Sequence, residues 1–209
     1  NVSRVRINAK FDSESGHHRL KMNETIKKKK YLNLYISTLF IFSVFYLHGK
    51  YNVGNDSTIS EWLINYEGGF TKRGLIGQIA INFSELFNYS LRESIFFFQV
   101  LSIATYYLLL ISFFRSIKFN KLILLAIFTP IFLLYPVAEI EVLGRKEIII
   151  FSFYLIYLSL QNFRQKNYFR IFLLPLLMLI WEPVIFFFIF CLIVDYIENV
   201  FYKNYKSLA

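Results

Sequence analysis

Two short segments of the sequence join a glycine to a pair of adjacent bases, a combination suited to binding an anion. Residues 68–74 read Gly-Gly-Phe-Thr-Lys-Arg-Gly, and residues 144–146 read Gly-Arg-Lys. Each segment comes where a helix is predicted to begin, and the free N–H groups and dipole of a helix N-terminus favour negative charge. The predicted anion-binding residues are Lys72, Arg73, Gly74, Arg145 and Lys146.

Phosphate or diphosphate is the natural ligand for such bases, and the two segments could hold one diphosphate between them. The other interpretation is that the four bases only extend to lipid headgroups.

Acidic residues lie close to both basic pairs. They are Asp56, Glu61, Glu67, Glu139, Glu141 and Glu147. Glu67 and Glu141 are each within a few residues of a basic pair, and a carboxylate there can act as a general base on a sugar hydroxyl. We predict Glu67 and Glu141 as catalytic residues, against the simpler interpretation that they neutralise the neighbouring bases. Three aromatic residues are predicted to stack on a sugar or an isoprenoid: Trp62, Tyr66 and Phe70.

The composition indicates what kind of structure positions these residues. Of the 209 residues, 56% are hydrophobic and 18% are charged, whereas a soluble domain carries about 25% charged residues. The apolar runs are close in length to the roughly 20 residues that cross a hydrocarbon core of about 30 Å. Backbone inside that core has no water to bond, so helices are expected. The predicted spans are 31–48, 94–114, 122–138, 148–161 and 171–194. The predicted fold is therefore all-α, a polytopic integral membrane protein with about five transmembrane helices.

The basic residues orient these spans. Residues 1–30 hold nine Lys or Arg and end in the unbroken run Lys27 to Lys30, which is typical of a cytoplasmic anchor. With this tail inside, the cytoplasmic segments hold 15 basic residues and the outer segments hold 8, as the positive-inside rule favours. The loops 49–93 and 139–147 and the tail 195–209 are then outside. An outer end is unusual for a complete chain and indicates a fragment of a larger protein.

The first outer loop, 49–93, is predicted to contain two helices. A short helix should begin near Ser60 and end at Gly68-Gly69. Thr71 can then cap a second helix over about 72–87, whose apolar residues recur at helical spacing. That pattern favours an amphipathic helix lying in the membrane interface; a loop helix packed on the spans is an equally good interpretation.

Glu182 is predicted to lie near the middle of the fifth span, next to Pro183. A carboxylate there costs roughly 2.5–3.5 kcal/mol on insertion scales and is a functional candidate by default. The alternative is a protonated Glu182 that bonds a carbonyl freed by the proline. A proton or cation pathway usually needs several such groups, and a single intramembrane acid argues against a transporter.

Other site types lack support in the sequence. The single cysteine, Cys191, and the three histidines show no metal-ligand spacing, so neither a metal nor a cofactor is predicted. The net charge is +9, but most of the excess lies in residues 1–30, beside the first span. Attraction to anionic headgroups explains that excess, so membrane lipids are predicted as partners and nucleic acid is not.

Residues 61–77, Glu-Trp-Leu-Ile-Asn-Tyr-Glu-Gly-Gly-Phe-Thr-Lys-Arg-Gly-Leu-Ile-Gly, resemble a pattern in uncharacterised polytopic bacterial membrane proteins of surface-polysaccharide assembly. The broader resemblance is to O-antigen-polymerase-like proteins and to membrane glycosyltransferases that use polyprenyl-linked sugars. The resemblance implies a multi-pass protein of the bacterial cytoplasmic (inner) membrane that binds a polyprenyl-linked sugar. It implies an enzyme, a glycosyltransferase or polysaccharide polymerase. The alternatives are a non-enzymatic membrane subunit with partner subunits, and a transporter with Glu182 as its coupling acid.

Overall fold

The computed structural model describes the backbone of residues 2–53, 57–117, 121–128 and 142–207. Every regular secondary-structure element in these residues is a helix, as the sequence predicts. The chain forms two compact units, residues 1–39 and residues 40–209. Glu141 and most of the predicted span 122–138 lie outside the described residues, and only α5 (Lys121–Phe128) covers the start of that span.

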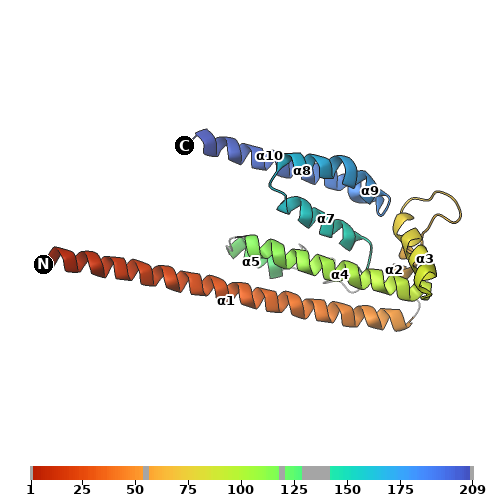
Figure 1. Ribbon diagram of the computed structural model, residues 1–209, viewed down its shortest axis with the longest axis horizontal. Helices are drawn as coiled ribbons and strands as arrows, with labels where there is room; N and C mark the ends of the chain where they lie inside the picture. The colour runs from red at the N-terminus through yellow and green to blue at the C-terminus, as the bar shows by residue number, and fades with distance from the viewer. Residues whose placement is uncertain (1, 54–56, 118–120, 129–141, 208–209) are drawn as a thin grey trace. The chain divides into compact units, whose positions relative to one another are not determined.

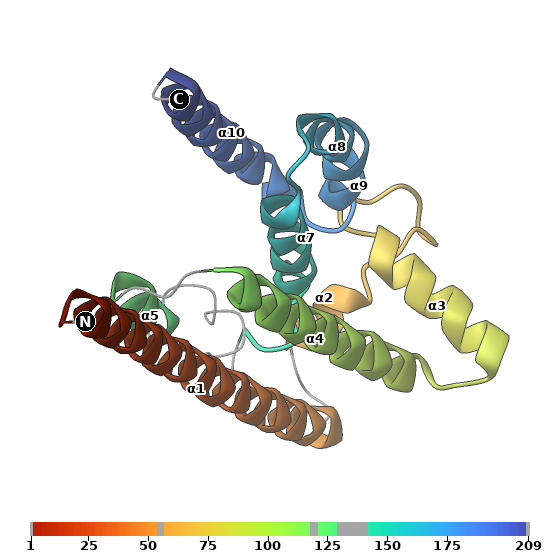
Figure 2. The ribbon, with the colours of Figure 1, turned by 60° about the vertical axis from the view of Figure 1, so that its left-hand side comes forward.

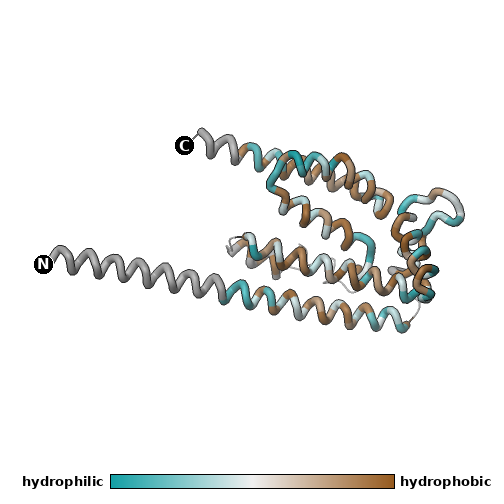
Figure 3. Tube along the Cα trace, viewed as in Figure 1, coloured by the Kyte–Doolittle hydropathy of each residue, from teal (hydrophilic) through white to brown (hydrophobic). Residues whose placement is uncertain are grey.

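Within the residues that the structure describes, three helical segments are long and apolar enough to cross a membrane. They are Lys27–Val53, Leu91–Ser116 and Glu182–Val200. The first is the apolar part of α1 (Val2–Val53), and the second is α4 (Leu91–Ser116). Figure 3 shows hydrophobic residues along much of α4 and of the described part of α10. The chain therefore has the helices of a membrane protein, whereas the count of five spans stays a prediction.

Helix α7 (Glu147–Ser159) is the counterpart of the predicted span 148–161. Thirteen residues rise only about 20 Å, at about 1.5 Å per residue, which is less than a hydrocarbon core of about 30 Å. The helix packs against α4 (Figure 2), and Ile148, Ile150 and Leu155 on it are buried. As it stands, α7 is a buried helix that is too short to cross a membrane alone.

The predicted fifth span, 171–194, is not one continuous helix. The chain from 163 onward consists of α8 (Phe163–Tyr168), the π-helix η1 (Phe169–Leu173), α9 (Leu174–Met178), the 3-10 turn η2 (Glu182–Val184) and α10 (Ile185–Ser207). Helix α10 runs back beside α8 (Figure 1), and Lys166 contacts Glu198 while Arg170 contacts Asp195. Residues 163–207 therefore form a helical hairpin, here called the C-terminal hairpin.

Two prolines account for the interruptions in the hairpin. Pro175 has no N–H to donate to the carbonyl four residues earlier, and the turn before it is the π-helix η1. Trp181, with φ −156° and ψ 112°, is extended, and Pro183 then begins η2. The chain reverses here, so Glu182 lies at the tip of the hairpin. The structure thus differs from the predicted mid-span position of this acid.

Two short helices lie between α1 and α4 in the described residues: α2 (Ser57–Trp62) and α3 (Leu75–Phe87). Helix α3 packs against α4 with Ala80 and Ile81 buried. A Cβ at Gly77 would lie 2.0 Å from the carbonyl oxygen of Ile64, so only glycine allows the loop backbone to pass this closely. The helix is where the sequence predicts one, and its interfacial position stays a prediction.

Candidate anion-binding site

The two basic segments, 68–74 and 144–146, meet at one end of the unit of residues 40–209. Lys146 Nζ donates a hydrogen bond of 2.8 Å to the carbonyl oxygen of Arg73. The segments are about 70 residues apart in the sequence, and this contact brings their bases into one cluster. We call Glu61, Arg73, Arg145, Lys146 and Glu182 the anion site.

Lys146 is a buried element of this cluster. Only 2% of its surface is exposed, and burial lowers the pKa of its ammonium to about 8, with Glu61 opposing that shift and Arg73 adding to it. Its Nζ bonds the backbone carbonyl of Arg73. Lys146 therefore fixes the loop that carries Arg73, and its ammonium faces protein.

Lys72 and Arg73 lie before helix α3, which differs from the prediction that they form its first turn. The helix begins at Leu75 with Gly74 as its N-cap, and the Thr71 hydroxyl donates to the carbonyl of Asn65 at 2.7 Å. Gly74 has a packing role, because a Cβ there would lie 2.5 Å from the Tyr66 ring. The helix start is therefore set by the fold of the loop and by the close packing at Gly74.

Arg73 itself has a left-handed backbone, with φ 66°. Its guanidinium donates to Glu182 Oε2 at 3.4 Å, and both side chains are about one-third exposed. The ion pair joins the loop before α3 to the tip of the C-terminal hairpin. Glu182 is thus paired with a guanidinium, which differs from the alternative interpretation of a protonated acid bonded to a freed carbonyl.

Arg145 is held by two carboxylates. Its Nη2 donates to Glu61 Oε1 at 2.9 Å, and its Nε lies 3.6 Å from Glu147 Oε1. The guanidinium remains about one-third exposed. The acids that the fold brings to the bases are therefore Glu61, Glu147 and Glu182. Of the two acids predicted to be catalytic, Glu67 lies in the exposed loop and Glu141 lies outside the described residues.

The predicted stacking residues have different surroundings. Trp62 is only 1% exposed, and its Nε1 donates to the carbonyl oxygen of Gly144 at 2.8 Å, alongside a bond of 3.0 Å from Gln99 Nε2. In this buried position Trp62 holds the turn that presents Arg145, whereas stacking on a ligand, as predicted from the sequence, needs an exposed ring. Tyr66 and Phe70 stack on each other, with centroids 5.6 Å apart, and Phe70 is exposed.

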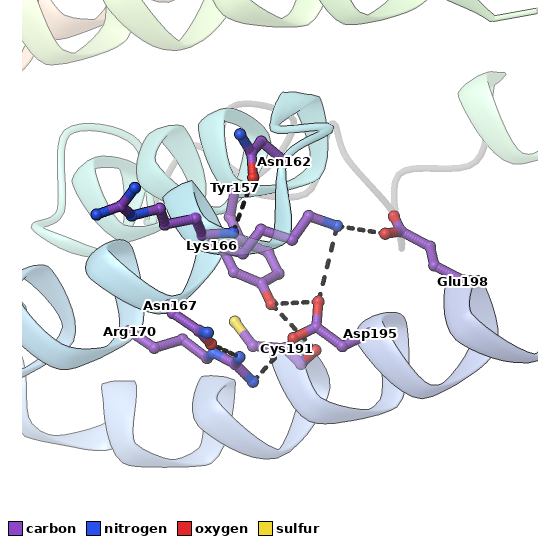
Figure 4. A network of polar contacts seen from close by, with 9 residues as sticks. Tyr157, Asn162, Lys166, Asn167, Arg170, Cys191, Asp195 and Glu198 are labelled. Carbon is purple, nitrogen blue, oxygen red and sulfur yellow. Dashed lines mark hydrogen bonds and ion pairs between the residues drawn. The ribbon is translucent and has the colours of Figure 1, made fainter. Parts of the chain in front are cut away.

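Sequence reasoning missed a second polar cluster at the other end of α7, drawn in Figure 4. We call Tyr157, Lys166, Arg170, Asp195 and Glu198 the hairpin cluster. A signal existed in the spacing, because Lys166 and Arg170 are four residues apart and Asp195 and Glu198 are three apart, so that each pair shares a helix face.

The anion site offers two guanidiniums that are partly exposed and held by carboxylates that water can also reach. A phosphate group can exchange with such carboxylates, because guanidinium binds both with the same bidentate geometry. Within the described residues, no group of three or more His, Cys, Asp or Glu side chains is placed to hold a metal ion. No protein-family model, curated protein or solved structure gives a significant match to this chain.

Proposed function

We propose that this chain is a protein of the bacterial inner membrane that binds the phosphate part of a polyprenyl-linked sugar on its outer face, in surface-polysaccharide assembly. The observation that carries the proposal is the meeting of two glycine–base segments, with Arg73 and Arg145 both partly exposed. Lys72, which precedes Arg73 in the sequence and is also exposed, adds a third cation. Because Glu182 and Glu61, which pair with the two guanidiniums, are partly exposed and can be displaced, these cations together with Lys72 suit a phosphate or diphosphate.

The topology of the hairpin supports an outward anion site. Because the hairpin reverses at Glu182, α10 carries Lys203 and Lys206 toward the end that holds Arg164 and Arg170. Lys203 and Lys206 then count as cytoplasmic residues. With this change, 17 of the 23 Lys and Arg are on the cytoplasmic side and 6 are on the side of the anion site. The positive-inside rule then favours an outer anion site and a cytoplasmic amino terminus more strongly than five single crossings do.

The carboxylates supply the catalytic part of the proposal. When a phosphate takes the guanidinium of Arg73 or Arg145, Glu182 or Glu61 is released beside it and can accept a proton from an acceptor hydroxyl. Glu67 and Glu141, the acids predicted from the sequence, remain candidates for the same role. Under this proposal the chain works as a glycosyltransferase or polymerase; a non-enzymatic subunit would use the bases alone.

The test is lipid binding by the purified protein in nanodiscs, measured by native mass spectrometry with undecaprenyl phosphate as probe and phosphatidylglycerol as competitor. The variant is Lys72→Ala/Arg73→Asn, because asparagine tolerates the left-handed backbone at 73 and the carbonyl there still accepts from Lys146. We expect about tenfold less undecaprenyl phosphate adduct, since a charged hydrogen bond contributes about 1.5–3 kcal/mol.

The matched control is Arg164→Gln, which removes an exposed cation at the other end of the C-terminal hairpin and should leave the adduct unchanged. If the Lys72→Ala/Arg73→Asn variant retains the adduct, or if both lipids bind equally before and after the change, the bases are headgroup anchors and the proposal fails.

A further inference from the structure

The hairpin cluster contains buried charges at the open end of the C-terminal hairpin (Figure 4). Lys166 and Asp195 are only 2% and 7% exposed, with Nζ 3.7 Å from Oδ1. Lys166 Nζ also lies 2.5 Å from Glu198 Oε2, and Arg170 Nη1 lies 2.8 Å from Asp195 Oδ2. Ionisable groups buried in a membrane protein are costly and mark functional sites.

The backbone beside this cluster departs from a regular α-helix. Arg170 lies inside the π-helix η1, where a wider turn changes the direction of its side chain, and π-bulges occur frequently at functional sites. Tyr157, from α7, donates a hydrogen bond of 2.7 Å to Asp195 Oδ1. Contacts from three helical segments, α7, α8 and η1, therefore hold the Asp195 carboxylate in place.

A cavity of about 570 Å³ opens beside the cluster. Its lining residues are Gln161, Asn162, Phe163, Lys166, Asp195, Glu198 and Asn199. Lys166 and Asp195 form a buried floor, whereas Glu198 is 54% exposed and the three amides and Phe163 are exposed at the rim. The volume lies within the range of about 300–1,000 Å³ that is typical of small-molecule sites.

The charges of the cavity indicate the class of its ligand. Among the lining residues, Lys166 pairs with both carboxylates, Asp195 and Glu198. Asp195 also pairs with Arg170, which lies outside the lining, so two cations balance two carboxylates and neither an anion nor a cation gains from entering. Carboxamides each offer both donors and acceptors, and the Phe163 ring adds an apolar face. Groups of this kind fit a neutral ligand with many hydroxyls.

We propose that this cavity binds a neutral sugar unit, with Glu198 and the amides of Gln161 and Asn199 bonding its hydroxyls and Phe163 contacting its ring. The site lies at the other end of α7 from the anion site and does not depend on the function proposed for that site. Lys166 and Asp195 position Glu198 and close the floor of the cavity, and their own charges stay paired.

The test is saturation-transfer difference NMR on the full chain in lipid nanodiscs prepared without glycosidic detergent. The probes are the methyl α-glycosides of glucose, galactose and mannose, with glucose 1-phosphate as the charged comparison. We expect transfer to at least one neutral glycoside. In the variant Gln161→Leu/Asn199→Leu the signal should fall by about threefold or more, because the rim loses its amides.

The matched control is Asn82→Leu, which removes an exposed amide from α3 and should leave the signal unchanged. Equal melting temperatures for the variants and the wild type establish that the fold is retained, and the single rim variants replace the double variant if it melts early. No transfer to any neutral glycoside, an equal signal from the rim variants, or stronger transfer to glucose 1-phosphate would overturn the proposal.

Discussion

The anion site and the hairpin cluster contain the same kinds of groups in opposite surroundings. In the anion site, Arg73 and Arg145 are about one-third exposed, and their carboxylate partners lie on loops and helix ends. In the hairpin cluster, Lys166 and Asp195 are almost fully buried on the faces of two packed helices. Charges that water reaches can exchange partners at low cost, whereas buried charges cannot. The anion site is thus suited to binding an ion, whereas the charged groups of the hairpin cluster keep their partners.

The largest expected effect comes from breaking the buried pair. Asp195→Asn leaves Lys166 and Arg170 with one carboxylate fewer and should reduce the free energy of unfolding by about 3–5 kcal/mol. Arg145→Gln, at the anion site, should reduce it by less than about 1 kcal/mol. Thermal unfolding of both variants in the same detergent checks the difference. Equal losses of stability would remove the distinction between the two sites.

A pH titration tests the one buried cation of the anion site. The folded-state pKa of Lys146 is lowered from 10.5 to about 8, so between these values the unfolded chain binds more protons than the folded one. The free energy of unfolding should therefore rise with pH in this window, by up to about 1.4 kcal/mol per pH unit. Below pH 8 both states are protonated and the slope from this group vanishes.

The measurement is the difference in melting temperature between the wild type and Lys146→Met at pH 7.5 and at pH 9.5. The melting temperature of the wild type relative to that of Lys146→Met should be higher at pH 9.5 than at pH 7.5. The melting temperature of Lys72→Met, a variant at an exposed position, should change with pH as that of the wild type does. A difference in melting temperature between the wild type and Lys146→Met that does not change with pH would mean that Lys146 is in contact with water.

The smallest effect is expected at the turn that carries Arg145. Trp62→Phe removes the bond from Nε1 to the Gly144 carbonyl, which keeps its bond from Gln99, so the loss of stability should be about 1 kcal/mol. The undecaprenyl phosphate adduct in native mass spectrometry should persist. Loss of the adduct at unchanged stability would instead support the stacking role predicted from the sequence.

The local features of the chain could be predicted because they depend on neighbouring residues. Hydrophobic runs gave the helices at 31–48 and 94–114, and the glycine pair with the apolar pattern gave a helix close to Leu75–Phe87. The fifth span was predicted as one crossing, because hydropathy alone does not distinguish a kinked helix from a hairpin. The reversal depends on the extended backbone of Trp181 and on the packing of Lys166 and Arg170 against α10.

The candidate anion site was likewise predicted in part from the sequence and decided in part by the tertiary structure. The sequence by itself determined that the chain forms apolar helices and that two glycine–base segments stand out from the rest, since composition and spacing are properties of short stretches. Only the tertiary structure decided that Lys146 is buried against Arg73, that Trp62 supports Gly144, and that Asp195 meets Lys166 and Arg170. Burial and charge pairing depend on residues far apart in the chain, and it is folding that brings these residues together and excludes water from between them.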